Sequence, residues 1–307
     1  MKEIKLFAPA TVANVSCGFD VLGFCLDPIG DEMIIRKTDQ PGVRITKIVG
    51  QDLPLVTKKN VAGVAAEALL ASLETPYGFE IEIYKNIKAG SGIGSSAASA
   101  AGAVFGINEL LGRPYSRKEL IQFAMKGEEL ASGVGHADNV SPALLGGFTL
   151  VRCNEPVDVI ALPSPSELYA TIIHPKIELR TADARSVLKK KIPLSKAIEQ
   201  WGNLAALVSG LHTDDYSLIS RSLVDVVIEP ERSPLIPFFN DLKAAAVNAG
   251  ALGSGISGSG PSIYALSKGE ETAQKVRQQM EEVFLPMNID FNTYVSKINA
   301  EGIKIIE

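Results

Sequence analysis

Several short stretches in the first half of the chain follow the two-residue period of a β-strand. Residues 78–86, GFEIEIYKN, place Phe79, Ile81 and Ile83 on one face, which predicts a strand with one buried side. Stretches rich in β-branched residues predict three further strands, at 3–8, 32–37 and 43–49.

Two other stretches in this half have the spacing of helices. Residues 59–74 repeat small and apolar side chains at helical intervals, and Asn60 is the candidate N-cap. Residues 116–131 begin with Ser116 and Glu119, which have the spacing of a capping box.

The second half alternates apolar strands with helices. Strands are predicted at 146–152, 167–174 and 262–266, and helices at 195–212, 214–227, 234–249 and 269–284. Prolines at 230, 234 and 237 predict a break before the third of these helices. We place the domain boundary between residues 152 and 153, which gives an N-terminal domain of 1–152 and a C-terminal domain of 153–307.

The composition is that of an ordinary globular protein. A chain of 307 residues forms one large domain or two of common size, and 46% apolar with 21% charged residues is typical of soluble proteins. The net charge of −5 argues against nucleic acid or an anionic membrane as the main partner. Cys17, Cys25 and Cys153 have no metal-site spacing and are odd in number, so we expect a reducing cytoplasm rather than a disulfide framework. No signal-peptide region and no membrane-spanning apolar run is visible.

The most unusual stretch is AGSGIGSSAASAAG, residues 89–102. It lies between a strand predicted to end near Asn86 and a helix predicted to begin near Ser95. A helix N-terminus attracts anions, and glycines let the backbone approach phosphate oxygens closely. A flexible turn with an N-cap would need only one Gly-Ser pair, so the three alternating glycines favour phosphate binding. It is not a Walker A loop, because no lysine follows the last glycine.

A second glycine-rich run covers residues 250–262, and Gly253, Gly255 and Gly258 match the pattern GxGxxG. This run follows a predicted helix and precedes a predicted strand, whereas a dinucleotide-binding loop joins a strand to a helix. Close backbone packing, which could support the first glycine loop, is therefore the better interpretation.

Three motifs together resemble those of the GHMP kinase superfamily. They are PATVANVSCGFDVLG at 9–23, GSGIGSSAAS at 90–99 and GSGISGSGPS at 253–262, in the family's order and spread over nearly the whole chain. Within the superfamily the chain most resembles the homoserine kinases, on the stretches 13–23, 135–148 and 180–188. It departs from the family's second motif at Lys88 and Ile93, where proline and leucine are usual. Lys88 either adds positive charge beside the phosphates or is a solvated surface lysine.

The resemblance implies a two-domain α+β fold. An N-terminal α/β domain similar to the second domain of ribosomal protein S5 would join a C-terminal ferredoxin-like domain, with ATP and the substrate in the cleft between them. ATP and Mg²⁺ are the implied cofactors, homoserine is the implied small-molecule partner, and a homodimer is possible.

The resemblance also implies residues for the nucleotide and the metal. Glu128 matches the family's metal-binding glutamate, with Ser95 or Ser96 as its partner; without the resemblance it would be taken for a surface carboxylate. The implied nucleotide-binding residues are Asn60, Lys85, Lys88, Gly90, Ser91, Gly92, Ile93, Gly94, Ser95, Ser96, Ala97 and Ala98. Asn60 and Lys85 are the weaker candidates, for the adenine end of the site, because an N-cap and a surface lysine need no further role.

Homoserine carries an ammonium, a carboxylate and a hydroxyl, so its site needs both an anion and cations. Asp20 fits the ammonium, and Arg185 and Arg232 fit the carboxylate. The other implied substrate-binding residues are Asn14, His136, Asn139 and Thr181, although turn, cap or structural roles would also explain several of them.

Catalysis would involve Glu128, Ser96 and Asn139. Mevalonate kinase and galactokinase have an aspartate at the position of Asn139, and an amide cannot accept the proton of the acceptor hydroxyl. We therefore expect transfer without a strong side-chain base, and we expect the neighbouring Asp138 to point elsewhere. Two alternatives stay open: another GHMP small-molecule kinase such as mevalonate kinase, and a catalytically silent member that binds a ligand and regulates a partner.

Overall fold

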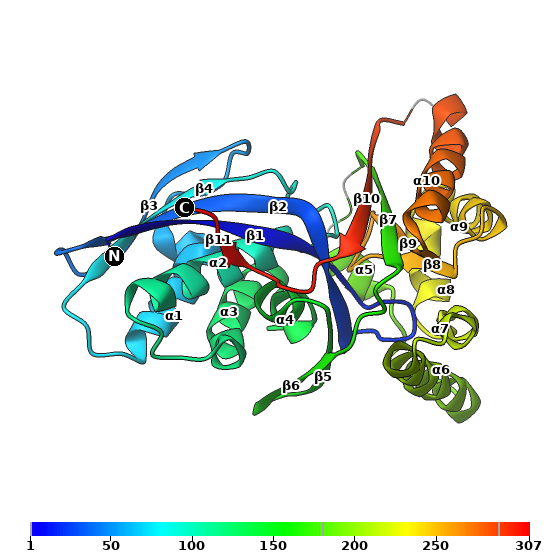
Figure 1. Cartoon of the computed structure of the whole chain (residues 1–307), viewed down its shortest axis with the longest axis horizontal. Coiled ribbons are helices and arrows are strands. Elements are labelled where there is room, and N and C mark those ends of the chain that lie inside the picture. The colour runs from blue at the N-terminus through cyan, green and yellow to red at the C-terminus, as the bar shows by residue number, and fades with distance from the viewer. Residues whose placement is uncertain (1, 178, 180, 288) are drawn as a thin grey trace.

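The computed structural model describes residues 2–177, 179, 181–287 and 289–307, so Arg180 of the stretch 180–188 lies outside the described residues. The N-terminal half is a sheet with helices beneath it in the view of Figure 1. Its central strand β2 (Leu22–Thr38) pairs antiparallel with β1 (Glu3–Ala13) and with β4 (Gly78–Tyr84), and β3 (Gly42–Val49) runs parallel to β4. The helices beneath are α1 (Val61–Ala71), α2 (Ser95–Leu110), α3 (Arg117–Ser132) and α4 (Ala137–Leu145).

The C-terminal half contains an antiparallel sheet in the order β10-β7-β9-β8. These strands are β7 (Leu168–Pro175), β8 (Gly253–Ile256), β9 (Ile263–Lys268) and β10 (Phe291–Ile298). The helices of this half are α5 (Thr181–Ser186), α6 (Leu194–Thr213), α7 (Tyr216–Ser222), α8 (Glu229–Arg232), α9 (Phe239–Asn248) and α10 (Glu270–Phe284). In Figure 1, α9 and α10 lie on the outer side of this sheet and α6 lies at the edge of the molecule.

Strand pairing joins the two halves. β10 continues the sheet onto β2 through the pairs Lys297↔Asp27 and Ile298↔Leu26, and β11 (Lys304–Ile305) returns to pair with β1. β5 (Phe148–Asn154) pairs with the first part of β2, and β6 (Val157–Leu162) pairs with β5. The boundary between residues 152 and 153 falls inside β5 and stays a prediction.

Both faces of the C-terminal sheet are buried. Along β7, Ile172 packs into the core shared with the N-terminal half, and the next residue, Ile173, packs into a second core under α9 and α10. On β9, Tyr264 likewise packs into the shared core and Ile263 packs into the second core. Because successive side chains of a strand point to opposite faces, one sheet contributes to two cores.

Small residues let α2 lie directly on β2. A Cβ at Gly102 would lie 2.2 Å from the sulfur of Met33, and one at Gly106 would lie 2.3 Å from Cδ1 of Ile35. Apart from Ser96 and Glu109, every residue of α2 is buried. The alanines and glycines that follow the first glycine loop thus let α2 pack closely on β2. This packing fixes the position of the N-terminus of α2.

The pattern predicted most of these elements. Asn60 caps α1 by accepting from the Ala62 amide, and α3 begins with the expected capping box of Ser116 and Glu119. The expected arrangement of two α/β halves is present. Four strands lie where the pattern predicted none, namely β6, β8, β10 and β11.

Two predicted helices were wrong in extent. The helix expected at 214–227 ends at Ser222, because the Asp225 carboxylate accepts from the backbone amides of the next turn, residues 227–229. The helix expected at 234–249 begins only at Phe239, after prolines 234 and 237, which cannot donate to a helical ladder. In the part of the chain that the structure describes, no helix is long and apolar enough to cross a membrane.

Candidate active site

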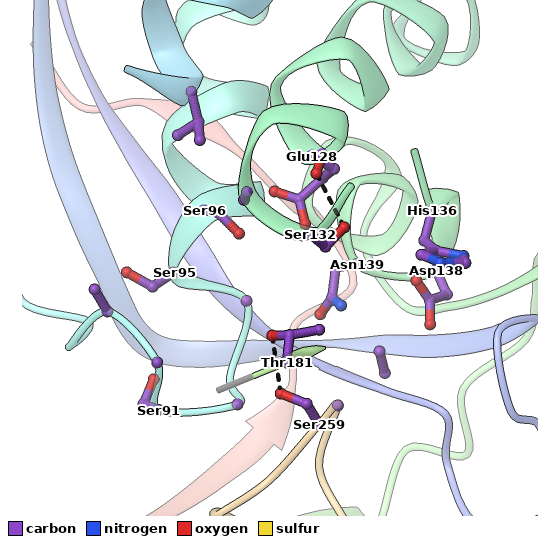
Figure 2. A pocket seen from close by; sticks show the side chains of 18 of the residues that line it. Ser91, Ser95, Ser96, Glu128, Ser132, His136, Asp138, Asn139, Thr181 and Ser259 are labelled. Atoms are coloured by element: carbon purple, nitrogen blue, oxygen red, sulfur yellow. Dashed lines mark hydrogen bonds between the residues drawn. The ribbon is translucent and has the colours of Figure 1, made fainter. Parts of the chain in front are cut away.

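A cavity of about 630 Å³ lies where the two halves of the chain meet (Figure 2). The first glycine loop (residues 89–94), α3 and the start of α4 line it from one half, and α5, Arg232 and residues 258–259 line it from the other. Its size is that of a small-molecule site. The predicted site residues that line it are Asn14, Asp20, Lys85, Gly90, Ser91, Gly92, Gly94, Ser95, Ser96, Glu128, His136, Asn139, Thr181, Arg185 and Arg232.

The first glycine loop has the predicted strand–loop–helix context. It follows β4 and ends at Gly94, the residue before α2. Gly90, Gly92 and Gly94 have φ values of 74°, 81° and 70°, a region that residues with a Cβ rarely adopt. The alternation of glycines is therefore required by the backbone, and the loop delivers the positive end of α2 to the cavity.

The two serines at the start of α2 differ in direction. The Ser95 hydroxyl donates to the carbonyl oxygen of Ile87 at 2.8 Å, back toward the strand. The Ser96 hydroxyl points toward Glu128 of α3 (Figure 2) and acts to lower the pKa of its carboxyl group. Of the two serines, Ser96 is therefore the one that faces Glu128.

Glu128 is buried, and one of its carboxyl oxygens, Oε1, has no hydrogen-bond partner. Burial raises the pKa of Glu128 to about 7, against the opposing effects of the Ser96 hydroxyl and the Lys85 charge. A buried oxygen without a hydrogen-bond partner destabilises the folded state unless another group, such as a cation, binds to it. Among the described residues no cluster of three or more His, Cys, Asp or Glu side chains could hold a metal by itself.

The second glycine run packs against the first loop, as its sequence context indicated. Ser257 donates to the carbonyl oxygen of Gly92 at 2.7 Å, and Ser262 donates to that of Ser91 at 2.5 Å. A Cβ at Gly92 would lie 2.7 Å from the carbonyl oxygens of Ser257 and Gly260. The C-terminal half therefore holds the shape of the loop from outside.

A buried histidine extends this contact. Nδ1 of His174, on β7, lies 3.1 Å from the Ser262 hydroxyl. Because that hydroxyl gives its proton to Ser91, the imidazole must be the donor, which fixes the Nδ1–H tautomer. Burial lowers the pKa of His174 to about 4, so the ring is neutral at physiological pH.

Opposite charges lie together at the other end of the cavity. The Arg185 guanidinium donates to both carboxylate oxygens of Asp20, at 3.0 and 3.2 Å, and to Nε2 of His136 at 2.9 Å. His136 Nδ1 lies 3.8 Å from Asp20. The predicted ammonium partner and one predicted carboxylate partner therefore neutralise each other here.

Arg232 is a second, more deeply buried cation. It donates to the carbonyl oxygens of Ala184 and Gly258 and lies over the ring of Phe19, which also contacts Arg185. Burial and the neighbouring Arg185 lower the pKa of Arg232 to about 10, so it stays charged at neutral pH. Two guanidinium groups beside one carboxylate leave a surplus of positive charge for an incoming anion.

The turn before Asp20 is strained. Asn14, Val15 and Ser16 have φ values of 73°, 37° and 58°, although none of them is glycine. The Asn14 side chain holds the turn, because it accepts from the Asp20 amide and donates to the carbonyl oxygen of Gly258. Asn14 thus connects the acceptor end of the cavity to the second glycine run.

Asn139 lies between the two ends of the cavity (Figure 2). Its side-chain oxygen accepts from the Thr11 hydroxyl at 2.8 Å. Asp138 was expected to point elsewhere, but it also lines the cavity, and burial raises its pKa to about 7. The start of α4 therefore presents both an amide and a carboxyl group.

Five predicted nucleotide-binding residues do not line the cavity: Asn60, Lys88, Ile93, Ala97 and Ala98. Both polar groups of the Asn60 side chain serve the local structure, since it caps α1 and donates to Pro54. Ile93 and the two alanines are buried in the core, whereas Lys88 is exposed.

Sequence reasoning missed several residues around the site. Thr11 contacts Asn139, Ser259 lies 3.3 Å from the Thr181 hydroxyl, and Asp31 forms an ion pair with Lys85. Only Asp31 had a visible signal, because it is an acidic residue directly before the apolar run of a predicted strand, EMII.

Comparisons with known proteins agree with this geometry. Models of the GHMP kinases N terminal domain and of the GHMP kinases C terminal region match residues 58–147 and 196–285. The homoserine kinase of Chlorobium phaeobacteroides is 49% identical over 321 residues and covers 100% of each chain. That of Chlorobaculum tepidum is 47% identical, covering 100% of this chain and 99% of the other.

The chain belongs to the homoserine kinase family of the GHMP kinases. A solved structure of homoserine kinase from Cytophaga hutchinsonii is 54% identical, with a TM-score of 0.96 over 100% of this chain and 98% of the other. Mevalonate kinase from L. major has a TM-score of 0.71 at 15% identity, over 96% of each chain. That likeness shows the shared fold alone.

The contact between the two glycine runs can be tested by a matched pair of variants. Gly92→Ala and Gly90→Ala introduce the same methyl group at similar positive φ, so both carry the same backbone strain. Only the new Cβ at position 92 would meet the second glycine run, since nothing lies within 4 Å of one at position 90. We expect Gly92→Ala to melt about 3 °C or more below Gly90→Ala in calorimetry. Equal melting temperatures would show that the contact does not hold the two halves together.

Proposed function

We propose that this chain transfers the γ-phosphoryl group of ATP to the hydroxyl of L-homoserine, giving O-phospho-L-homoserine and ADP, a step of threonine biosynthesis. The observation that carries the proposal is a single cavity with a glycine loop and Glu128 at one end and Asp20, Arg185 and Arg232 at the other. One end suits phosphates and the other suits a small zwitterion. The names of the relatives at 47–54% identity over the whole chain support the same acceptor.

The phosphates are bound by the first glycine loop and the N-terminus of α2. Backbone amides and the helix dipole attract their negative charge without a Walker lysine. Gly90, Ser91 and Gly92 give the loop its close approach, and Ser257 and Ser262 keep it in shape from the other half. Adenine is expected at the end of the cavity lined by Leu53 and Val61.

The residues present fit Mg²⁺. Mg²⁺ prefers oxygen ligands, keeps several waters and commonly takes only one or two carboxylates in addition to substrate phosphates. We assign Glu128 and Ser96 as its protein ligands, because the unpartnered Glu128 oxygen and the Ser96 hydroxyl face each other, whereas Ser95 turns away. When bound, the ion neutralises charge on the phosphate oxygens.

Homoserine binds by exchanging partners with the Asp20–Arg185 pair. Its ammonium takes the carboxylate of Asp20, and its carboxylate takes the guanidinium groups of Arg185 and Arg232. Before binding, the charges of Asp20 and Arg185 neutralise each other, whereas Arg232 is held by two carbonyl oxygens and stays available for the substrate carboxylate. Asn14 accepts from the Asp20 amide, His136 accepts from Arg185, and Thr181 lines the same cavity.

Asn139 orients the acceptor hydroxyl toward the phosphoryl group. Transfer forms the new P–O bond as the bond to ADP breaks, and the hydroxyl proton leaves to a phosphate oxygen or to water. The Thr11 hydroxyl occupies the Asn139 side-chain oxygen, which leaves the amide group free to donate to the acceptor. Positioning and charge neutralisation, rather than a strong base, then lower the barrier.

The two alternatives fit the site less well. Mevalonate has a carboxylate but no ammonium, so a mevalonate site would gain nothing from Asp20. A silent ligand-binding regulator would have no need of a metal ligand, yet Glu128 stays buried with an oxygen free for one.

The metal role of Glu128 predicts the behaviour of Glu128→Gln. The variant keeps the shape and removes the charge, so kcat should fall about a hundredfold or more while homoserine binding changes little. Glu129→Gln is the matched control, because Glu129 lies next along α3 and pairs only with Lys126 on the surface. A coupled assay of ADP release over a series of Mg²⁺ concentrations measures both. Wild-type turnover of Glu128→Gln at limiting Mg²⁺ would remove the metal assignment.

The ammonium role of Asp20 predicts selectivity between two acceptors. Losing one partner of a desolvated charge pair costs roughly 2–5 kcal/mol of binding free energy. Because Asp20→Asn also releases Arg185 from its ion pair, we expect a loss at the lower end of this range. Homoserine kcat/KM should fall about thirtyfold. The homoserine analogue that lacks the amino group should have a low kcat/KM with the wild type, and Asp20→Asn should lower this value little further. An equal loss for both acceptors would mean that Asp20 does not bind the ammonium.

We also propose that the enzyme is a homodimer that works in the cytoplasm, where its ATP is. Leu194, Ile198 and Trp201 lie on one face of α6, at 68%, 52% and 55% exposure. A stripe of large apolar side chains on one helix is typical of a surface covered by another chain. In Figure 1 this helix is at the edge of the molecule.

Trp201→Glu should therefore give a monomer in light scattering, with an unchanged fold by circular dichroism. Leu285→Glu is the control, because Leu285 is exposed to 70% but lies elsewhere, after α10. Trp201 is the single tryptophan of the chain, so its fluorescence reports the same event on dilution of the wild type. A Trp201→Glu protein of unchanged mass would exclude this helix from the interface.

A further inference from the structure

Lys85 and Asp31 form a buried ion pair under the first glycine loop. Their side chains are 1% and 0% exposed, so the pair has almost no contact with water, although Lys85 borders the cavity. Asp31 comes from β2, and Lys85 follows the end of β4. A buried pair is often no more stabilising than apolar residues of the same volume, so it calls for another explanation.

The contacts of Lys85 show that its ammonium is fully used inside the protein. Besides Asp31, it donates to the carbonyl oxygen of Ser95 at 2.9 Å and to the Ser99 hydroxyl at 3.1 Å. An ammonium has three donors, so none is left for a nucleotide. Both acceptors lie on the first turns of α2, where the loop ends.

The contacts of Asp31 lie at the opposite end of the loop. Its second oxygen accepts from the backbone amides of Asn86 and Ile87, at 2.8 and 2.9 Å, just after β4. The carbonyl oxygen of Ile87 in turn accepts from the Ser95 hydroxyl. The pair therefore holds the backbone on both sides of the loop, and apolar residues could not satisfy these backbone groups.

We propose that the Asp31–Lys85 pair is a positioning clamp for the phosphate loop, which acts on the nucleotide only through the loop and does not contact the base. This inference rests on the proposed function, since it assumes that the loop binds the phosphates of ATP. The clamp fixes the distance between the two ends of the loop. It thereby sets the direction of the loop amides and of Ser96 at the start of α2.

The clamp assigns Lys85 a role other than the adenine contact that the resemblance implied, and the two roles differ in one observable. A residue that contacts the base changes the preference between ATP and inosine triphosphate, which differ only in the base. A clamp changes the affinity for both nucleotides equally. Base selectivity therefore separates the two roles, independently of stability.

The test uses the neutral double variant Asp31→Asn/Lys85→Met, which leaves no unpaired buried charge. The asparagine oxygen can still accept from residues 86 and 87, so the hold on α2 is lost together with the Lys85 charge that lowers the pKa of Glu128. A misplacement of about 1 Å can cost a hundredfold, so we expect the affinity for both nucleotides to fall about tenfold to a hundredfold. The ratio between them and the binding of homoserine alone should stay unchanged.

Arg36→Met/Glu82→Gln is the matched control. Arg36 and Glu82 form an ion pair between the same two strands, β2 and β4, but away from the loop. It should leave nucleotide affinity at the wild-type value. Ser99→Ala, which removes one acceptor of Lys85 and no charge, provides a milder variant if the double variant does not fold, and it should weaken both nucleotides severalfold.

Calorimetric titration of each nucleotide, without acceptor, gives the affinities. Unchanged affinity in the folded double variant, or in Ser99→Ala where that variant stands in for it, would overturn the clamp. So would a changed ratio between the two nucleotides, which would place Lys85 at the base. Failure of the proposed function would look different: the wild type would bind nucleotide but release no ADP with homoserine.

Discussion

The contact between the two glycine-rich runs is the constraint on which the site depends. Ser257 and Gly92, 165 residues apart in the sequence, bring the backbones of the two halves together with only a hydroxyl between them. No larger residue than glycine fits at this point, because a Cβ at Gly92 would meet two carbonyl oxygens. The first glycine loop therefore has its shape only when both halves are folded and in place.

The fold could be predicted from the sequence where a short-range pattern decides it. The alternation in GFEIEIYKN gave β4, and the spacing of Ser116 and Glu119 gave the start of α3. The pattern failed where a side chain overrides helical spacing, as Asp225 does by accepting the amides that would continue α7. Local spacing contains no information about such a competing acceptor.

The residues of the candidate site could be predicted where they belong to the sequence motifs. The motifs placed Ser96, Glu128, Asp20 and Arg185 in one site, and all four line one cavity. Their partners could not be predicted, because Asp20 meets Arg185 across 165 positions of sequence. The same holds for the partners of Asp31, which are Lys85 and two backbone amides just after β4.

The pairing of β10 with β2 has a consequence for how the enzyme can open. Since one sheet runs through both halves and its two faces belong to two cores, a hinge rotation would have to break strand pairs and repack buried side chains. An architecture of this kind therefore resists opening by the swing of one half against the other.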